Sequence, residues 1–271
     1  MIESQLQDRP VPSSVDRPSP SDTTLGDYAY TVIKKQFQAL TKQKQNVLAD
    51  EDPEHLHKMR VAARRLQSAL QVFETVIELP KSAQLHQVRS LGKALGKLRD
   101  LDVQTAAITN QYCPQLNTSE QETVQTLLKQ LQKERHQAFA AVETLLRSPY
   151  KKIKAAYEDW LTSPQYGAIA QLSLAIVIPD LVNPLLSALL LHPAWLISAQ
   201  SGEASPDTAD QAMLHDLRKA LKAVRYQSEF FEPFYDSAFQ TWIAELKNPA
   251  RRSRETPRQR RFVKNAALPK S

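Results

Sequence analysis

The chain has 271 residues, of which 42% are apolar and 24% charged, so it can bury a hydrophobic core. Its net charge of +6 comes from one end: residues 248–271 hold eight Lys or Arg and one Glu, a net of +7, and the rest sums to −1. The overall charge therefore indicates no anionic partner, and only local clusters of cations can. The single cysteine, Cys113, excludes an internal disulfide and a cysteine-based zinc site, and it fits a reducing compartment.

The composition predicts an all-α protein. There are only five glycines, good helix formers dominate, and long alternating β-branched runs are absent. The N-terminus lacks the apolar run of a signal peptide, and stretches such as Leu185–Leu191 are far shorter than the roughly 20 residues of a membrane span. We therefore expect a cytoplasmic protein with no membrane segment.

Residues 1–23 are rich in Pro, Ser and Asp, which predicts disorder. Helical periodicity starts at Leu25 and runs to just before Asp50. Asp52 as cap and Pro53 in the first turn then start a helix that we expect to end at Leu79, before Pro80. Further helices are predicted over 83–110, 118–146, 150–162, 179–191, 209–231 and 237–247, and the helix over 179–191 is expected to be buried.

The short connections favour antiparallel neighbours in a bundle. We place a first bundle at about 24–163 and a second at about 164–247. Residues 248–271 form an Arg-rich tail.

Two of the predicted helices share a pattern. HKMRVAARRLQSALQVFE (57–74) aligns without a gap with HDLRKALKAVRYQSEFFE (215–232), an offset of 158 residues. At about 100° per residue, Arg60, Arg64 and Gln67 lie within about 80° of His57, opposite the apolar stripe. The same angles on the second helix are taken by His215, Arg218, Lys222 and Arg225. These residues are flanked by Lys219 and Tyr226.

A cationic face opposite the core is usually a solvated surface. Such surfaces normally mix signs, because like charges four residues apart repel. No acid lies between His57 and Ser68, or between Lys219 and Ser228. The repetition of this His-plus-cation ridge favours a site for an anion, since Arg offers forked donors to phosphate oxygens and Lys a point charge.

The stretches LHKMRVAARRLQSAL, LGKALGKLRDLDV and LHDLRKALKAVRYQSEFF resemble the CHAD (conserved histidine α-helical domain) family over about Leu25 to Lys247. The resemblance implies two antiparallel four-helix bundles related by a pseudo-twofold axis, with a basic channel between them that binds inorganic polyphosphate rather than catalysing a reaction. The polyphosphate-binding residues that it implies are His57, Arg60, Arg64, Arg65, Arg99, His215, Arg218, Lys219, Lys222, Arg225 and Tyr226. Arg99 and Asp100 belong to the family pattern, and Arg99 has a structural alternative, an ion pair with Asp102.

Two positions depart from the family pattern. The family usually has a basic residue where Gln67 stands. A second-half counterpart of LGKALGKLRDLD is expected near 250–260, where the chain instead has two prolines nearby and six Arg within 251–261. We expect a truncated or frame-shifted domain end, or a replaced tail, so the final helix of the second bundle is in doubt.

Other constellations are weaker. His55 and His57 lie two apart on a helix and do not face one another, and the sequence has no P-loop and no Ser/His/Asp motif. We therefore expect no catalytic residues, no metal and no cofactor. We predict a cytoplasmic polyphosphate-binding protein, including at polyphosphate granules. The alternatives are nucleic-acid or general polyanion binding through the Arg-rich tail and a scaffold whose channel binds an acidic peptide.

Overall fold

The computed structural model describes residues 22–197 and 208–247. The predicted disordered segment lies almost entirely outside these residues. The Arg-rich tail, and any helix in its place, lies outside them as well.

The described residues are almost entirely helical, which confirms the all-α prediction. The helices are α1 (Leu25–Lys42), α2 (Lys44–Ala49), α3 (Pro53–Val72), α4 (Leu85–Ala107), α5 (Thr118–Arg147), α6 (Pro149–Thr162), α7 (Leu174–Leu190), α9 (Thr208–Ser228) and α10 (Ser237–Lys247). Short 3-10 turns join several of them, and a π-helical turn (Ile108–Tyr112) follows α4. The strands described are β1 (Ile77–Glu78) and β2 (Gln165–Tyr166), which pair antiparallel.

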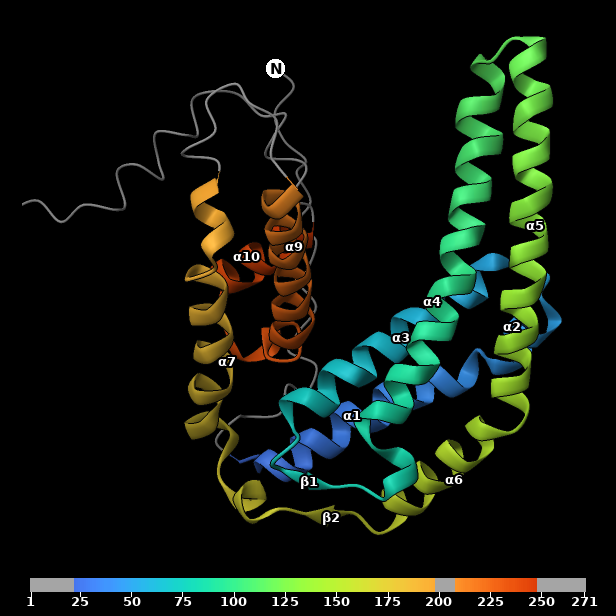
Figure 1. Ribbon diagram of the computed structural model, residues 1–271. Helices are drawn as coiled ribbons and strands as arrows, with labels where there is room; N and C mark the ends of the chain where they lie inside the picture. The colour runs from blue at the N-terminus through green and yellow to red at the C-terminus, as the bar shows by residue number, and fades with distance from the viewer. Residues whose placement is uncertain (1–21, 198–207, 248–271) are drawn as a thin grey trace, which may run out of the picture.

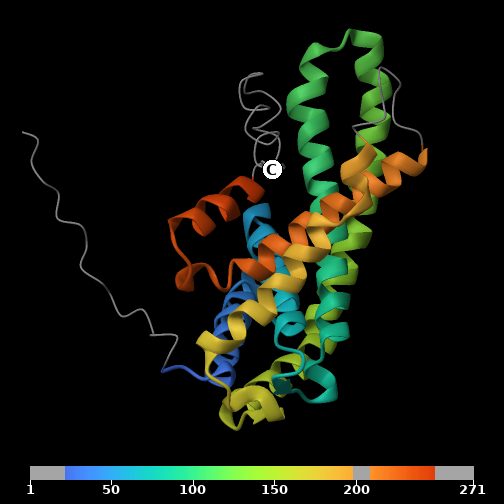
Figure 2. The ribbon, with the colours of Figure 1, turned by 90° about the vertical axis from the view of Figure 1, so that its left-hand side faces the viewer.

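The helices form two groups (Figure 1). Helices α1 to α6 make the larger one, in which α4 and α5 run side by side as a long hairpin. Helices α7, α9 and α10 make the smaller one, and Figure 2 shows them in front of α1 and α3. A large apolar core fills the first group and extends to Phe230 and Phe231, and a smaller cluster around Leu217 and Val224 lies between α7 and α9.

The helix starts follow the capping signals in the sequence. The Asp52 side chain accepts a hydrogen bond from the Glu54 backbone N–H at 2.8 Å, as predicted for the start of α3. Asn117, one residue before the predicted start of α5, forms a reciprocal capping box with Glu120.

The predicted helix ends are less accurate. Helix α3 stops at Val72 rather than Leu79, because the backbone N–H groups of Val76 and Ile77 turn back to the Phe73 carbonyl and the chain then enters β1. The first helix is also broken at Gln43, and Asp50 follows it with a left-handed φ of 54°.

Helix α7 begins at Leu174, five residues before the predicted start, and Pro179 and Pro184 lie inside it. The prediction that it is buried holds for one face only. Val177 and Val182 are in the core, but Ile176 is 73% exposed and Leu190 is 74% exposed.

One guanidinium group ties three elements of the first group together. Arg135 of α5 donates to both carboxylate oxygens of Asp50 at 2.6 and 2.7 Å, and its Nε donates to Asp102 of α4 at 2.8 Å. These hydrogen bonds raise the pKa of Arg135 despite its partial burial. The Asp102 side chain is only 9% exposed, and Arg135 provides its counter-charge.

We expect Arg135→Ala to lower the free energy of unfolding by about 3 kcal/mol, because it leaves Asp102 buried without its counter-charge. Chemical denaturation measures the change. Arg147→Ala is the matched control, since it removes an exposed pair with Glu143 and should cost less than about 0.5 kcal/mol. Equal costs for the two variants would contradict this role of Arg135.

Candidate functional site

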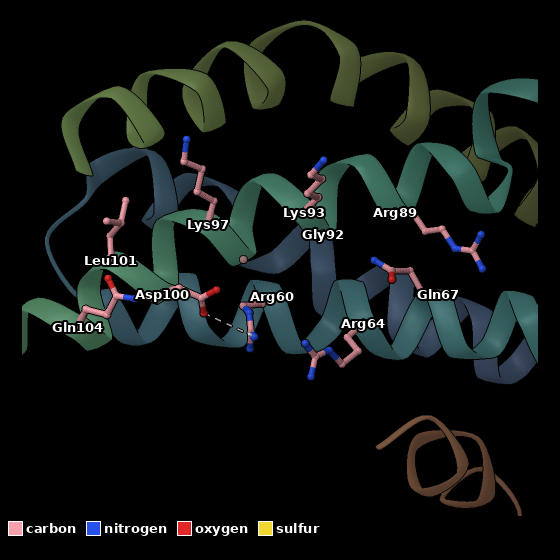
Figure 3. Close-up of a pocket in the computed structure, with 11 residues that line it drawn as sticks. Arg60, Arg64, Gln67, Arg89, Gly92, Lys93, Lys97, Asp100, Leu101 and Gln104 are labelled. Carbon is pink, nitrogen blue, oxygen red and sulfur yellow. Dashed lines mark ion pairs between the residues drawn. The ribbon is translucent and has the colours of Figure 1, made fainter. Parts of the chain in front are cut away.

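Helices α3 and α4 run antiparallel and enclose a groove with a volume of about 780 Å³. This α3–α4 groove is lined by Arg60, Arg64, Gln67, Arg89, Gly92, Lys93, Gly96, Lys97, Asp100, Leu101 and Gln104 (Figure 3). Its lining contains five cations and one acid, so it is strongly electropositive.

Two predicted residues, Arg60 and Arg64, form part of the α3 wall. Burial lowers the pKa of Arg60, and the neighbouring charge of Arg64 lowers it further. Asp100 acts in the opposite direction, but its carboxylate is 4.0 Å from Arg60 and its side chain is largely exposed. The positive charge of this wall is therefore only partly offset.

The α4 wall carries three cations that the sequence analysis did not assign to the site. Arg89, Lys93 and Lys97 recur every four residues, so they lie one above the other on one face of the helix. The buried residues of α4 lie on the other face, as shown by Leu91 and Leu95. The signal for Lys93 and Lys97 was present in LGKALGKLRD, where each of these lysines follows a glycine, and Arg89 lies just before this stretch.

Gly92 leaves room for a side chain of α3. The Gln67 side chain lies across it and donates to the Val88 carbonyl at 3.1 Å. A Cβ atom at position 92 would collide with the Gln67 amide nitrogen. Gln67, which stands where the family usually has a cation, thus ties α3 to α4 at this end of the groove.

The structure places the second cationic ridge, on α9, against the first. The Tyr226 ring lies 4.3 Å from the guanidinium carbon of Arg225 and 5.5 Å from that of Arg64, so it contacts cations of both repeats. Lys222 of α9 is close enough to the α3 arginines for their charges to change its pKa. Its pKa is lowered first by burial, then by Arg218 of its own helix, and also by Arg64 and Arg60 of α3.

Several predicted residues have other partners. Lys219 forms an exposed ion pair with Asp216 at 2.6 Å and lowers the pKa of that carboxyl. Arg65 binds Glu229 at 2.7 Å. The proposed pair between Arg99 and Asp102 is wrong, because Arg99 donates to the Pro53 carbonyl at 3.4 Å and Asp102 pairs with Arg135.

The histidines differ in their surroundings. His57 lies half-buried on α3, and His215 is exposed on α9. His55 contacts the side-chain amides of Asn46 and Gln43. Across residues 22–197 and 208–247 no group of three or more His, Cys, Asp or Glu side chains could hold a metal ion, and none of the helices there is both long and apolar enough to cross a bilayer.

The architecture is thus that of an all-α protein in which two repeated cationic helices lie against each other. A sequence model of the CHAD domain matches residues 31–251, and the chain belongs to this family. The resemblance seen in the sequence is confirmed.

Two solved structures share the fold. The crystal structure of the CHAD domain from the plant Ricinus communis superposes with a TM-score of 0.59 at 23% identity, covering 84% of this chain and 72% of that one. PptA from Streptomyces chartreusis superposes with a TM-score of 0.55 at 18% identity, covering 83% of this chain and 82% of that one. No curated protein matches the sequence.

The groove gives a first test of its packing. Alanine normally stabilises a helix relative to glycine by about 1 kcal/mol, but Gly92→Ala should lose this gain, because the new methyl group pushes the flexible end of Gln67 off the Val88 carbonyl and that hydrogen bond contributes about 0.5–1.5 kcal/mol. Thermal or urea denaturation measures the change.

Gly96→Ala is the control, since a Cβ there would meet only Arg60 Nε at 3.8 Å, an ordinary contact. We expect it to be stabilising. In a Gln67→Ala background, Gly92→Ala should stabilise by as much as Gly96→Ala. If Gly92→Ala stabilises the wild-type chain by as much as Gly96→Ala, Gln67 does not hold this position.

A second test concerns Lys222. Because its pKa is lowered, a larger fraction of its amine is uncharged near pH 8, and it should react faster with amine-acylating reagents than the ion-paired Lys219. Arg64→Ala removes one cause of the shift and should slow the reaction of Lys222. Competitive labelling followed by peptide mass spectrometry measures both rates, and a Lys222 rate no higher than that of Lys219 would contradict the shift.

Proposed function

We propose that the chain binds inorganic polyphosphate, with the phosphate chain lying along the α3–α4 groove and between the cations of α3 and α9. One observation carries the proposal: the Tyr226 ring of one repeat lies 5.5 Å from the Arg64 guanidinium of the other and 4.3 Å from that of Arg225, so cations of both repeats meet around it. These cations are held together against their mutual repulsion, and a bound polyanion would relieve it.

The spacing of the cations favours a ligand with repeated charges. Lys93 and Lys97 lie one helical turn apart on α4, and Arg60 and Arg64 do so on α3, so charges repeat about every 6 Å along both walls. Arginine can bind phosphate oxygens through two parallel hydrogen bonds, and lysine adds a mobile point charge. A single phosphate would use only part of this surface.

The same lining favours binding over catalysis. It contains cations, amides, one leucine, two glycines and the carboxylate of Asp100, but no hydroxyl, thiol or imidazole that could act as a nucleophile with its base. We therefore propose that the chain holds polyphosphate without cleaving it, and that it does so in the cytoplasm, including at polyphosphate granules.

The test compares long-chain polyphosphate with duplex DNA at equal salt, using Arg60→Ala/Arg218→Ala and the wild type. We expect tight polyphosphate binding by the wild type and weaker DNA binding. The double substitution should weaken polyphosphate binding at least tenfold for each arginine, since a hydrogen bond to a charged group contributes about 1.5–3 kcal/mol.

The matched control is Lys151→Ala/Lys152→Ala, which removes the same charge from exposed positions on α6. It should reduce affinity only slightly, through the change in net charge. If the two double variants lose affinity equally, the groove is not the site. If DNA binds as tightly as polyphosphate, the site is not specific for polyphosphate.

The Arg-rich tail supports one alternative, nucleic-acid or general polyanion binding, because six arginines fall within residues 251–261. Deleting 248–271 separates the two proposals. Polyphosphate binding that survives the deletion belongs to the helical domain, and binding that disappears belongs to the tail.

A further inference from the structure

Glu229 lies immediately after α9, and its side chain is only 8% exposed. One carboxylate oxygen accepts a hydrogen bond from Arg65 of α3 at 2.7 Å. The other lies 3.7 Å from Nε of Arg225, one turn earlier in the chain. One buried carboxylate is thus shared by two of the arginines that the sequence analysis assigned to polyphosphate.

The internal repeat shows that this arrangement is made only once. Under the offset of 158 residues, Arg65 corresponds to Ala223 and Glu229 corresponds to Gln71, so neither charge is present in the equivalent place. Arg225 corresponds to Gln67, which is engaged with the Val88 carbonyl. The carboxylate shared by two arginines therefore occurs at the end of α9 and has no equivalent at the end of α3.

Glu229 lies next to the point where the two repeat helices meet. The equivalent residues Phe73 and Phe231 meet at 6.3 Å between ring centres, so the C-terminal ends of the two repeat helices converge there on an apolar cluster. Glu229 lies two residues before Phe231. The other cations lie earlier along both helices, where burial, Arg218 and then the α3 arginines lower the pKa of Lys222.

We propose that Glu229 is a positioning residue that ties the end of α9 to α3 through Arg65 and holds Arg225 of its own helix beside that contact, and that these two arginines orient the anion site without binding the anion. The inference rests on the proposed function and divides the predicted cations into two sets. The ligand is then held by Arg60, Arg64, Arg218 and Lys222 together with the α4 cations. Turning Arg65 toward a ligand would remove a 2.7 Å charged hydrogen bond from the buried Glu229 carboxylate, and turning Arg225 would move a second cation away from it, and both changes are unfavourable.

The salt dependence of polyphosphate binding separates the two sets. The logarithm of the binding constant for polyphosphate falls linearly with the logarithm of the salt concentration. Each lost phosphate contact reduces the steepness of this fall by about 0.7, the value for a flexible single-stranded polyanion. Arg60→Ala and Arg64→Ala should each reduce the steepness by about this amount. Arg65→Ala, one residue further along the same helix, should lower the melting temperature and leave the slope unchanged.

The tie itself is tested without any ligand. Arg65→Ala and Glu229→Gln should each lower the melting temperature, and the double variant should be no less stable than the worse single variant, because both remove the same contact. At a temperature where the variant is folded, Glu229→Gln should also slow acylation of Lys222, since α9 is then less firmly held against Arg64 and Arg60. Arg65→Lys, which keeps the charge, should retain part of the stability.

The outcomes are distinct. A fall in the salt slope for Arg65→Ala as large as that for Arg60→Ala would show that Arg65 binds the anion and would overturn the inference. Additive losses of stability, or an unchanged Lys222 rate in Glu229→Gln, would overturn the tie. Absence of polyphosphate binding by the wild type would instead refute the proposed function, and the ligand-free measurements would still decide whether Glu229 holds the two helices.

Discussion

Two rows of like charge can lie side by side only if nearby contacts offset their repulsion, and the aromatic junction beneath α3 and α9 provides these contacts. Tyr28 packs against Phe73, Phe231 and Phe234, and its hydroxyl donates to the Phe230 carbonyl. Burial raises the pKa of Tyr28 to about 12, so this donor stays protonated across the physiological range. Apolar burial at one end of the helix pair thus permits an electropositive surface further along it.

The repeat and the ridge could be predicted because both depend on local order. A period of 3.6 residues fixes which side chains share a face, and caps such as Asp52 fix where a helix begins. The end of α3 could not be predicted in this way. Ile77 leaves the helix to pair with Tyr166, 89 positions along the chain, and no local pattern encodes that partner.

The candidate site shows the same division. The cations of α3 and α9 follow from the repeat, whereas Arg89, Lys93 and Lys97 become part of the site only because α4 packs antiparallel to α3. The pairing of Arg65 was also hidden, because its partner Glu229 is 164 residues away. A residue type and its angle on a helix therefore predict where a charge points, but only the tertiary structure shows whether that charge is already neutralised.

Side-chain hydrogen bonds connect the two walls of the α3–α4 groove at both of its ends. Arg135 links Asp50, just before α3, to Asp102 near the end of α4, and Gln67 links the later part of α3 to Val88 near the start of α4. The walls are therefore tied at both ends, and a hinge-like opening would have to break one of these contacts. A groove whose width is held before binding requires less ordering of its walls when a ligand of that width enters.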